Sequence, residues 1–234
     1  MKQEKRYWAV VPAAGVGKRM GAEVPKQYLQ LNGKTILEHT VIRIARHPRI
    51  EAVVVVTSKE DDAFSRLSWP SDCKVFNTYG GAERCHSVLN GLHFIEPHGG
   101  VDDWVLVHDA ARPCILERDI SRLIDQANEQ GGILALPMAD TVKRADTQQR
   151  ICETVDRSTL WRALTPQMFP LQALAKALHH AINNDFLVTD EASAMEYAGV
   201  RPQLVEGEAS NIKITTPSDL DYAAFVMQQQ EKLA

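Results

Sequence analysis

Strand-sized apolar runs alternate along this chain with segments of helical periodicity. Residues 52–57 form a continuous run of Ala, Val and Thr, typical of a strand buried on both faces. Further strands are predicted over residues 7–11, 74–77, 104–108, 133–137, 203–205 and 212–215. Helices are predicted over residues 35–46, 83–94, 117–130 and 171–183, from residue 216, and in short segments near 61–67 and 189–193. This alternation predicts an α/β fold with a doubly wound, mostly parallel sheet.

Residues 138–158 depart from this alternation. Residues 141–145 and 150–155 flank a polar turn, Asp146-Thr147-Gln148-Gln149, and predict the two strands of a hairpin. The hairpin has little apolar surface, and an isolated hairpin is marginal in water. We therefore expect a single domain over residues 1–234, from which residues 138–158 protrude as a β-arm that packs on the main domain or on another subunit.

Composition excludes several classes of protein. The net charge of −4, from 26 basic and 30 acidic residues, argues against nonspecific nucleic-acid binding. The apolar runs are far shorter than a membrane span, and the polar N-terminus lacks the pattern of a signal peptide, so no membrane partner is expected. The four cysteines form no CxxC pair, which predicts a reduced, cytoplasmic protein without a zinc or disulfide framework.

The loop after the first predicted strand is suited to an anion. It is built from small residues, Ala13, Ala14, Gly15 and Gly17. Such residues let main-chain N–H groups approach an anion closely, because no bulky side chain intervenes. Arg19 and Lys26 follow and add positive charge. The combination favours a polyphosphate ligand.

Two better-known glycine loops fit poorly. The dinucleotide fingerprint requires a third glycine where Met20 stands, and an acidic residue after the second strand, which here ends at Ser58. The Walker loop requires Ser or Thr after Gly-Lys, but Arg19 stands there. From the loop alone, a plain strand–turn–helix connection with solvated cations remains the alternative.

Polar residues follow several other predicted strands, and parallel sheets bind ligands at the carboxyl ends of their strands. These residues are Gly80, Gly81, Arg84 and Ser87; His108, Asp109 and Arg112; and Asp140, Thr141 and Lys143. Asp109 suits Mg²⁺ or a ribose hydroxyl, or it forms an ordinary Asx turn. Lys213 lies between Ile212 and Ile214 and either projects into a site or is simply exposed.

The chain carries nine such motifs, namely Pro12 to Met20, Pro25-Lys26-Gln27, Gly80-Gly81, Arg84 to Val88, His108 to Pro113, Asp140 to Lys143, Thr165-Pro166-Gln167, Thr189 to Ser193 and Asn211-Ile212-Lys213. They cover nearly the whole chain. Taken jointly, these motifs resemble the 2-C-methyl-D-erythritol 4-phosphate cytidylyltransferases of the non-mevalonate route to isoprenoids. The resemblance implies a fold of nucleotidyltransferase type and transfer of a cytidylyl group from CTP to a polyol phosphate.

The resemblance also implies roles for individual residues. Arg19 and Lys26 would be catalytic, stabilising charge at the α-phosphate. The nucleotide would contact Ala13, Ala14, Gly15, Gly17, Gly81, Ser87, Asp109 and Ala110. The polyol phosphate would contact Arg112, Thr141, Arg157, Thr165, Thr189 and Lys213. Mg²⁺ or another divalent cation would assist, with Asp109 as its candidate ligand. In a homodimer formed through the arm, Thr141 and Arg157 would serve the neighbouring site.

Three other functions share part of this pattern. A cytidylyltransferase for another polyol phosphate, such as ribitol 5-phosphate, would share the nucleotide half and differ around Thr141 and Arg157. A nucleotide-binding regulatory module would lack turnover, and the presence of both Arg19 and Lys26 argues against it. A dinucleotide oxidoreductase is disfavoured by Met20 and by the missing acidic residue.

Overall fold

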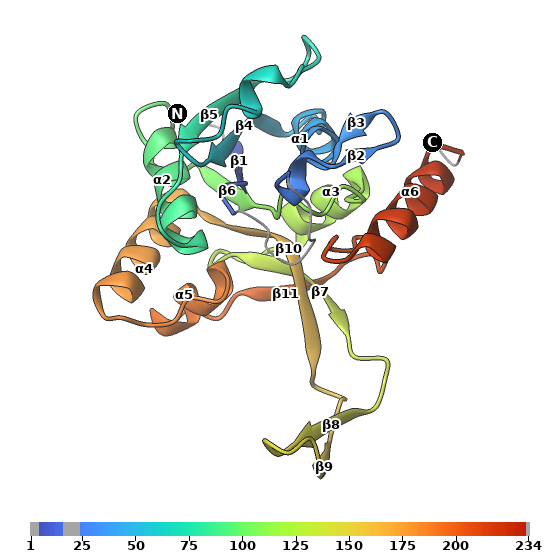
Figure 1. The fold of residues 1–234 in the computed structure, drawn as a ribbon. Coiled ribbons are helices and arrows are strands. Elements are labelled where there is room, and N and C mark those ends of the chain that lie inside the picture. Colours follow the sequence, from blue (N-terminus) through green and yellow to red (C-terminus); the bar gives the residue numbers. More distant parts are fainter. Residues whose placement is uncertain (1–4, 16–23, 233–234) are drawn as a thin grey trace.

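The computed structural model describes residues 5–15 and 24–232, and a seven-stranded sheet forms its centre. The strands are β1 (Tyr7–Pro12), β4 (Ile50–Thr57), β5 (Val75–Tyr79), β6 (Trp104–Val107), β7 (Gly132–Pro137), β10 (Trp161–Pro170) and β11 (Gln203–Glu206). Their order across the sheet is β11-β7-β10-β6-β1-β4-β5. Among the described strands of this sheet, only β10 is antiparallel to its neighbours, β6 and β7. The predicted mostly parallel α/β sheet is confirmed (Figure 1).

Helices cover both faces of the sheet, because side chains of successive strand residues point to opposite faces. One face carries α2 (Arg84–Ile95), α4 (Leu171–Asn183) and α5 (Glu191–Tyr197), and the other carries α1 (Ile36–Ala45) and α3 (Glu117–Gln126). In β1, Trp8 and Val10 belong to the first core, whereas Ala9 and Val11 belong to the second. None of the helices in the described ranges has the length and apolar composition needed to cross a bilayer.

The last helix, α6 (Pro217–Lys232), begins where the sequence predicts. The Asp219 carboxylate accepts the backbone N–H groups of Thr215 and Thr216, both at 2.8 Å, which caps the first turn. The predicted strand over residues 212–215 is wrong. This segment is a loop that crosses the strand ends instead of pairing along an edge, and its Ile214 N–H donates to Ala111 O, beyond the end of β6, at 2.8 Å.

One strand and one helix end also differ from the prediction. Strand β10 was not predicted, since proline within a run argues against a central strand, and the pairing of β10 with β7 is irregular between Ala163 and Gln167, around Pro166. Helix α3 ends at Gln126, not at Gln130, and a turn closed by Gly131 follows, where φ is +109°. The minor elements are β2 (Gln30–Leu31), β3 (Lys34–Thr35) and the 3-10 helices Lys26–Tyr28 and Phe64–Arg66.

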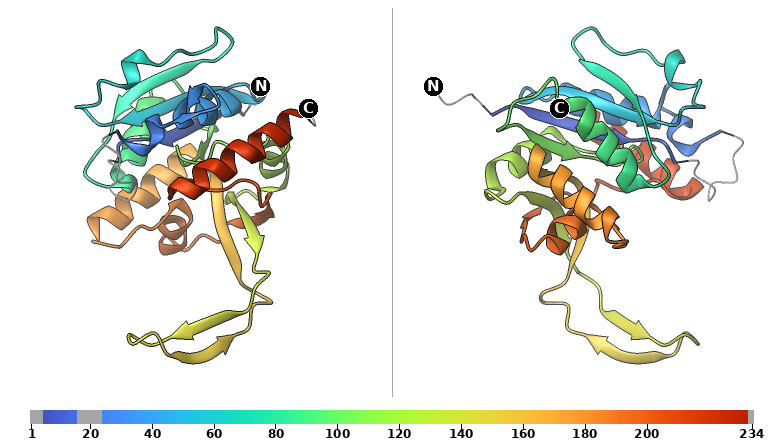
Figure 2. Two further views of the ribbon diagram at one scale, coloured as in Figure 1. Left: turned by 45° about the vertical axis from the view of Figure 1, so that its right-hand side comes forward. Right: turned by 90° about the vertical axis from the view of Figure 1, so that its left-hand side faces the viewer.

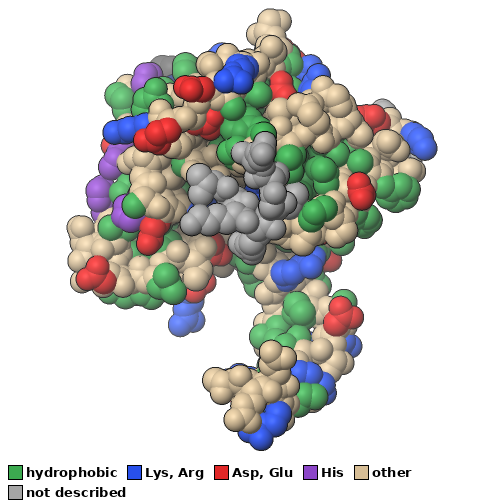
Figure 3. All heavy atoms as spheres, viewed as in Figure 1, with side chains coloured by type: hydrophobic (Ala, Val, Ile, Leu, Met, Phe, Trp, Pro, Cys, Tyr) green, Lys and Arg blue, Asp and Glu red, His purple; other side chains and the backbone are tan. Residues whose placement is uncertain are grey.

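The predicted hairpin is present and stands clear of the domain. It consists of β8 (Val142–Ala145) and β9 (Ile151–Val155), paired antiparallel. The two views of Figure 2 show the arm projecting from the ends of β7 and β10. Ile151 is 68% exposed, and Figure 3 shows apolar and charged side chains together along the arm. Of the two packing partners expected, the arm's own domain is therefore excluded for this conformation.

Candidate active site

A pocket of about 350 Å³ lies at the carboxyl ends of β1, β5 and β6. Nearly all the residues predicted to contact a nucleotide line it, namely Ala13, Ala14, Gly15, Gly81, Ser87, Asp109 and Ala110. Lys26 and Lys213 line it as well. The predicted residues Gly17 and Arg19 fall outside the described residues. The carboxyl ends of three strands, β1, β5 and β6, thus meet at one pocket, as the strand-end rule predicts.

The loop after β1 is tied to the segment that carries Lys26. Ala13 donates its N–H to Val56 O at 2.7 Å, which extends the β1–β4 pairing by one residue. The Gln27 amide donates to Ala13 O at 2.7 Å and is buried. Lys26 Nζ donates to Ile214 O at 3.3 Å, in the loop that also holds Lys213. Gln27 therefore fixes where Lys26 enters the pocket.

The turn after β5 explains why two glycines stand before α2. A Cβ on Gly80 would lie 2.5 Å from Ser87 Oγ and 2.8 Å from Ala14 Cβ. This close approach brings the β5 turn against the β1 loop, which only glycine permits. Gly81 N donates to Ser87 Oγ at 3.3 Å, and that hydroxyl donates to Glu83 O at 3.1 Å. Ser87 is consequently held in one orientation at the pocket wall.

Asp109, directly beyond β6, is surrounded by cations. Its Oδ1 lies 3.2 Å from Arg84 Nη2, and its Oδ2 lies 2.9 Å from Lys213 Nζ and 3.4 Å from Arg112 Nε. Burial alone would raise the pKa of this carboxyl, but Arg84, Lys213 and Arg112 hold the pKa well below its usual range. Asp109 therefore remains a carboxylate, and it gathers three cations beside the pocket.

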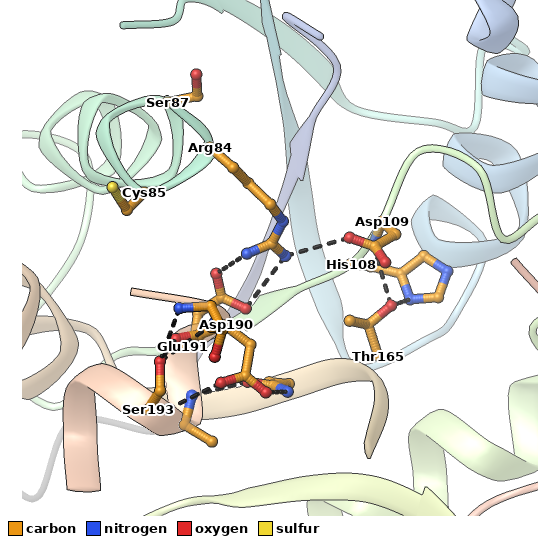
Figure 4. A network of polar contacts seen from close by, with 12 residues as sticks. Arg84, Cys85, Ser87, His108, Asp109, Thr165, Asp190, Glu191 and Ser193 are labelled. Carbon is orange, nitrogen blue, oxygen red and sulfur yellow. Dashed lines mark hydrogen bonds and ion pairs between the residues drawn. The ribbon is translucent and has the colours of Figure 1, made fainter. Parts of the chain in front are cut away.

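Arg84 also contacts a second, more deeply buried carboxylate. Glu191, the first residue of α5, has a side chain that is 1% exposed. Its Oε1 lies 2.6 Å from Arg84 Nη1, and its Oε2 lies 3.3 Å from Nη2. Figure 4 shows the Arg84 guanidinium between Glu191 and Asp109. One guanidinium thus joins α2, α5 and the end of β6.

A buried chain of hydrogen bonds fixes the backbone at Asp109. Its N–H donates to Thr165 Oγ1 at 3.1 Å, and the Thr165 hydroxyl lies 3.1 Å from His108 Nδ1. His108 Nε2 lies 3.1 Å from Arg112 O. Because the Arg112 carbonyl can only accept, the imidazole proton is assigned to Nε2, and the Thr165 hydroxyl therefore donates to the unprotonated Nδ1. Burial lowers the pKa of His108 to about 4, so the ring is neutral at pH 7.

His108 should make folding stability sensitive to mild acid. The unfolded chain protonates this imidazole below about pH 6.5, but the folded chain does so only near pH 4, so stability falls as the pH drops between these values. We expect wild type to lose about 3 kcal/mol more than His108→Gln over this range. Urea unfolding at pH 6.5 and pH 4 measures both losses, and equal losses would contradict the assignment.

The donor set at Asp109 is compatible with Mg²⁺. A carboxylate offers about four acceptor positions, and Arg84, Arg112 and Lys213 occupy three. Mg²⁺ is commonly held by one or two carboxylates together with substrate phosphates and water. One remaining position on Asp109 therefore suffices, provided that a polyphosphate supplies further oxygens. The residues present fit such an ion.

The predicted polyol-phosphate residues do not all gather at the pocket. Lys213 lines the pocket, whereas Arg112 and Thr165 are buried in the network behind Asp109. Thr189 is exposed near the start of α5 and donates its N–H to Ser193 Oγ at 3.1 Å. Thr141 and Arg157 are exposed on the arm, where the Arg157 guanidinium donates to Ala139 O. Neither arm residue lines the pocket of its own subunit.

Sequence reasoning gave no role to Gln27, Glu191 or Asn211. Asn211 is buried, its side-chain amide donates to Thr165 O at 2.8 Å, and its main-chain carbonyl accepts from Arg112 Nη1 at 2.8 Å. All three residues lie inside the motifs on which the family resemblance rests. Their partners are distant in the chain, so no local pattern discloses what they hold.

Comparison with known proteins identifies the family. The family model described as IspD, 2-C-methyl-D-erythritol 4-phosphate cytidylyltransferase, matches residues 7–229. A protein of that name from Tolumonas auensis is 55% identical over 227 residues, covering 96% of this chain and 98% of the relative. Another from Vibrio vulnificus strain YJ016 is 52% identical over 225 residues, with 95% of each chain covered. These matches extend through both the pocket residues and the arm.

Solved structures agree with the sequence matches. The crystal structure of the Francisella tularensis enzyme of the same name superposes with a TM-score of 0.82 at 38% identity, covering 95% of this chain and 100% of the other. A structure titled 4-diphosphocytidyl-2C-methyl-D-erythritol synthase gives the same TM-score at 39% identity, covering 96% and 100%. The pocket, its cations and these matches over nearly full length together show that the chain belongs to the 2-C-methyl-D-erythritol 4-phosphate cytidylyltransferase family.

Proposed function

We propose that the pocket binds CTP and that the enzyme transfers the cytidylyl group to the phosphate of 2-C-methyl-D-erythritol 4-phosphate. The products are 4-diphosphocytidyl-2-C-methyl-D-erythritol and pyrophosphate. The observation that carries the proposal is the pocket of glycine-loop residues, Lys26, Lys213 and Asp109 in a chain that matches this family over residues 7–229. Small residues and backbone N–H groups suit the nucleotide phosphates, and the cations suit their charge.

The reaction depends more on the positioning of its two substrates than on a general base. An oxygen of the polyol phosphate, already ionised at neutral pH, forms a bond to the α-phosphorus of CTP, and the bond from that phosphorus to the pyrophosphate oxygen breaks. The difficulty is to bring two anions together and to stabilise the charge that develops. Lys26 and Lys213 line the pocket on which both substrates converge. Oriented cations and an in-line arrangement supply the rate enhancement.

We infer that Mg²⁺ or another divalent cation is bound beside Asp109 when CTP is present. Asp109 would supply one carboxylate oxygen, and the phosphates of CTP would supply others. When bound, the ion neutralises phosphate charge and orients the polyphosphate. Asp109 also keeps Lys213 at 2.9 Å, so it connects the polyol-phosphate side of the pocket with the triphosphate side.

Pyrophosphate release tests the function directly. Folded protein with CTP and Mg²⁺ is assayed with 2-C-methyl-D-erythritol 4-phosphate and with ribitol 5-phosphate, side by side. We expect release with the first alone. Release with ribitol 5-phosphate alone would leave the assignment of the nucleotide site intact and contradict the assignment of the acceptor. If neither acceptor gives pyrophosphate release, in protein that still binds CTP, the result would favour a regulatory module.

We also propose that the arm completes the site of a second subunit in a homodimer. Ile151 is exposed at 68%, and the arm's hairpin has no core of its own, so it needs a partner surface. Thr141 and Arg157 would then meet the polyol phosphate in the partner's pocket. Neither residue lines the pocket of the chain that carries it, and the arm projects away from the domain (Figure 2), which supports this arrangement.

Mixed dimers provide the test of the arm. In a heterodimer of Lys26→Ala and Arg157→Ala, one site contains both changes and the other contains neither, if the arm acts on the neighbour. After subunit exchange of equal amounts, about a quarter of wild-type activity should return at low polyol phosphate, since half the dimers are mixed and each has one intact site. If the arm serves its own subunit, no intact site forms and activity stays at the level of the parent variants.

We place the enzyme in the cytoplasm on the chemistry of its cysteines. All four, Cys73, Cys85, Cys114 and Cys152, are free thiols. Burial raises the pKa of Cys114 to about 11, so this thiol remains protonated and unreactive. Free thiols of this kind are usual in reducing compartments.

A further inference from the structure

We propose that Glu191 is a positioning residue that acts through Arg84: its buried carboxylate fixes the guanidinium so that Arg84 meets both Asp109 and the bound phosphates in one orientation. This inference rests on the proposed function of the pocket. Arg84 lines the pocket and its side chain is one third exposed, whereas Glu191 is enclosed behind it. Glu191 therefore acts on substrate only through Arg84.

The contacts favour orientation over simple charge pairing. Glu191 engages Arg84 through both carboxylate oxygens, at 2.6 and 3.3 Å, and the same Nη2 atom then reaches Asp109 at 3.2 Å. A bidentate pair specifies the plane of a guanidinium, which a single contact does not. Without Glu191, Asp109 is the remaining partner of Arg84 among the described residues, and Asp109 is shared with Arg112 and Lys213.

Glu191 lies next to Arg84 (Figure 4) but is not part of the pocket lining. Asp109 is shared among Arg84, Arg112 and Lys213, so it does not fix the orientation of Arg84 by itself. Losing Glu191 would let the guanidinium turn toward Asp109 and away from the bound phosphates. The orientation of Arg84 thus depends on a side chain that touches no substrate.

The position of Glu191 is itself fixed by strand β10. Gln167 on β10 donates to Asp190 Oδ2 at 2.8 Å and accepts the N–H of Ala192 at 2.8 Å. Gln167 is paired in register with Val107, two residues before Asp109. Gln167 therefore links the start of α5 to the end of β6 through β10. This link keeps the distance between the Glu191 and Asp109 carboxylates constant.

The test combines Glu191→Gln with a matched control. Asp103→Asn removes another buried carboxylate that is paired with an arginine, Arg6 at 3.1 Å, and that also accepts from Trp8 Nε1 at 2.9 Å. Asp103 precedes β6, whereas Asp109 follows it, so the control lies at the opposite end of the same strand. Both changes should lower the melting temperature. Only Glu191→Gln should lower kcat/KM for CTP, by about 10-fold, less than the loss of a direct donor.

Epistasis separates positioning from a general effect on the fold. In an Arg84→Ala background, Glu191→Gln should cause no further loss of kcat/KM, because its route to the substrate is gone. KM for the polyol phosphate should stay within about twofold of wild type. Multiplicative losses in that background, or wild-type kcat/KM in Glu191→Gln, would overturn the proposal.

Two further experiments keep the proposal testable if the Glu191→Gln variant or the assay fails. If Glu191→Gln does not fold, Arg84→Lys retains the charge but loses the bidentate geometry, and it should show the same loss; wild-type kinetics in that variant would overturn the proposal. If wild type itself releases no pyrophosphate, the proposed function fails separately. Calorimetry with inorganic pyrophosphate then decides the role of Glu191, with about 10-fold weaker binding expected in Glu191→Gln and equal binding overturning it.

Discussion

Replacing Lys26 with alanine is expected to lower kcat by at least ~10²-fold, the effect of removing one preorganised donor from a site of charge development. Lys26 lines the pocket next to the β1 loop, and Gln27 anchors its segment to Ala13. The ammonium group is thus brought to the triphosphate from a fixed backbone. Because the negative charge at the α-phosphate grows in the transition state, the loss should fall on kcat more than on KM.

Lys74→Ala is the matched control for this prediction. Lys74 is an exposed lysine beside the amino end of β5, far from the strand ends that form the pocket, and it pairs with Glu51 at 2.8 Å. Its removal should leave kcat unchanged. Initial rates at saturating CTP and polyol phosphate measure both variants. A Lys26→Ala enzyme with wild-type kcat would refute the catalytic role.

Replacing Asp109 with asparagine is expected to lower kcat by ~10²-fold or more and also to remove much of the dependence of CTP binding on Mg²⁺. Asp109 is the shared partner of Arg84, Arg112 and Lys213, and asparagine has no charge to hold them. Loss of one member of a buried ionic cluster also destabilises folding by about 3–5 kcal/mol. Three cations without their common anion leave the pocket more positive.

The excess positive charge should affect metal-free ligand binding and turnover in opposite directions. Metal-free pyrophosphate should bind more tightly to Asp109→Asn than to wild type, although turnover falls. Calorimetry with pyrophosphate, with and without Mg²⁺, measures both effects, and Asp103→Asn at the other end of β6 serves as the control. Weaker metal-free binding in Asp109→Asn would contradict the charge argument, and unchanged Mg²⁺ dependence would remove Asp109 from the metal site.

Much of the fold follows from local sequence, because burial on both faces of a parallel sheet dictates the composition of each strand. The run over residues 52–57 becomes β4, and the helical spacing over 171–183 becomes α4 with the same bounds. Strand β10 could not be obtained in this way. Its identity depends on pairing with β6 and β7, which are distant in the chain, and Pro166 argues locally against a strand.

The site was predictable as a set of residues at strand ends, but not as a set of contacts. Asp109 and Arg84 both follow strands of the sheet, so their convergence follows from topology. The pair between Arg84 and Glu191 joins residues 107 apart, and Glu191 lies at the start of a helix rather than at a strand end. Similarly, Lys213 was expected on a strand and instead reaches Asp109 from a loop.

The central claim is that these residues align two phosphates for a single in-line displacement, without a covalent intermediate on the protein. The stereochemical course at the α-phosphorus tests this claim most directly. One diastereomer of CTP that carries sulfur on the α-phosphate is turned over, and the configuration of the product is determined. The account predicts inversion, as one displacement requires. Retention would indicate two displacements through a cytidylylated side chain and would contradict the account.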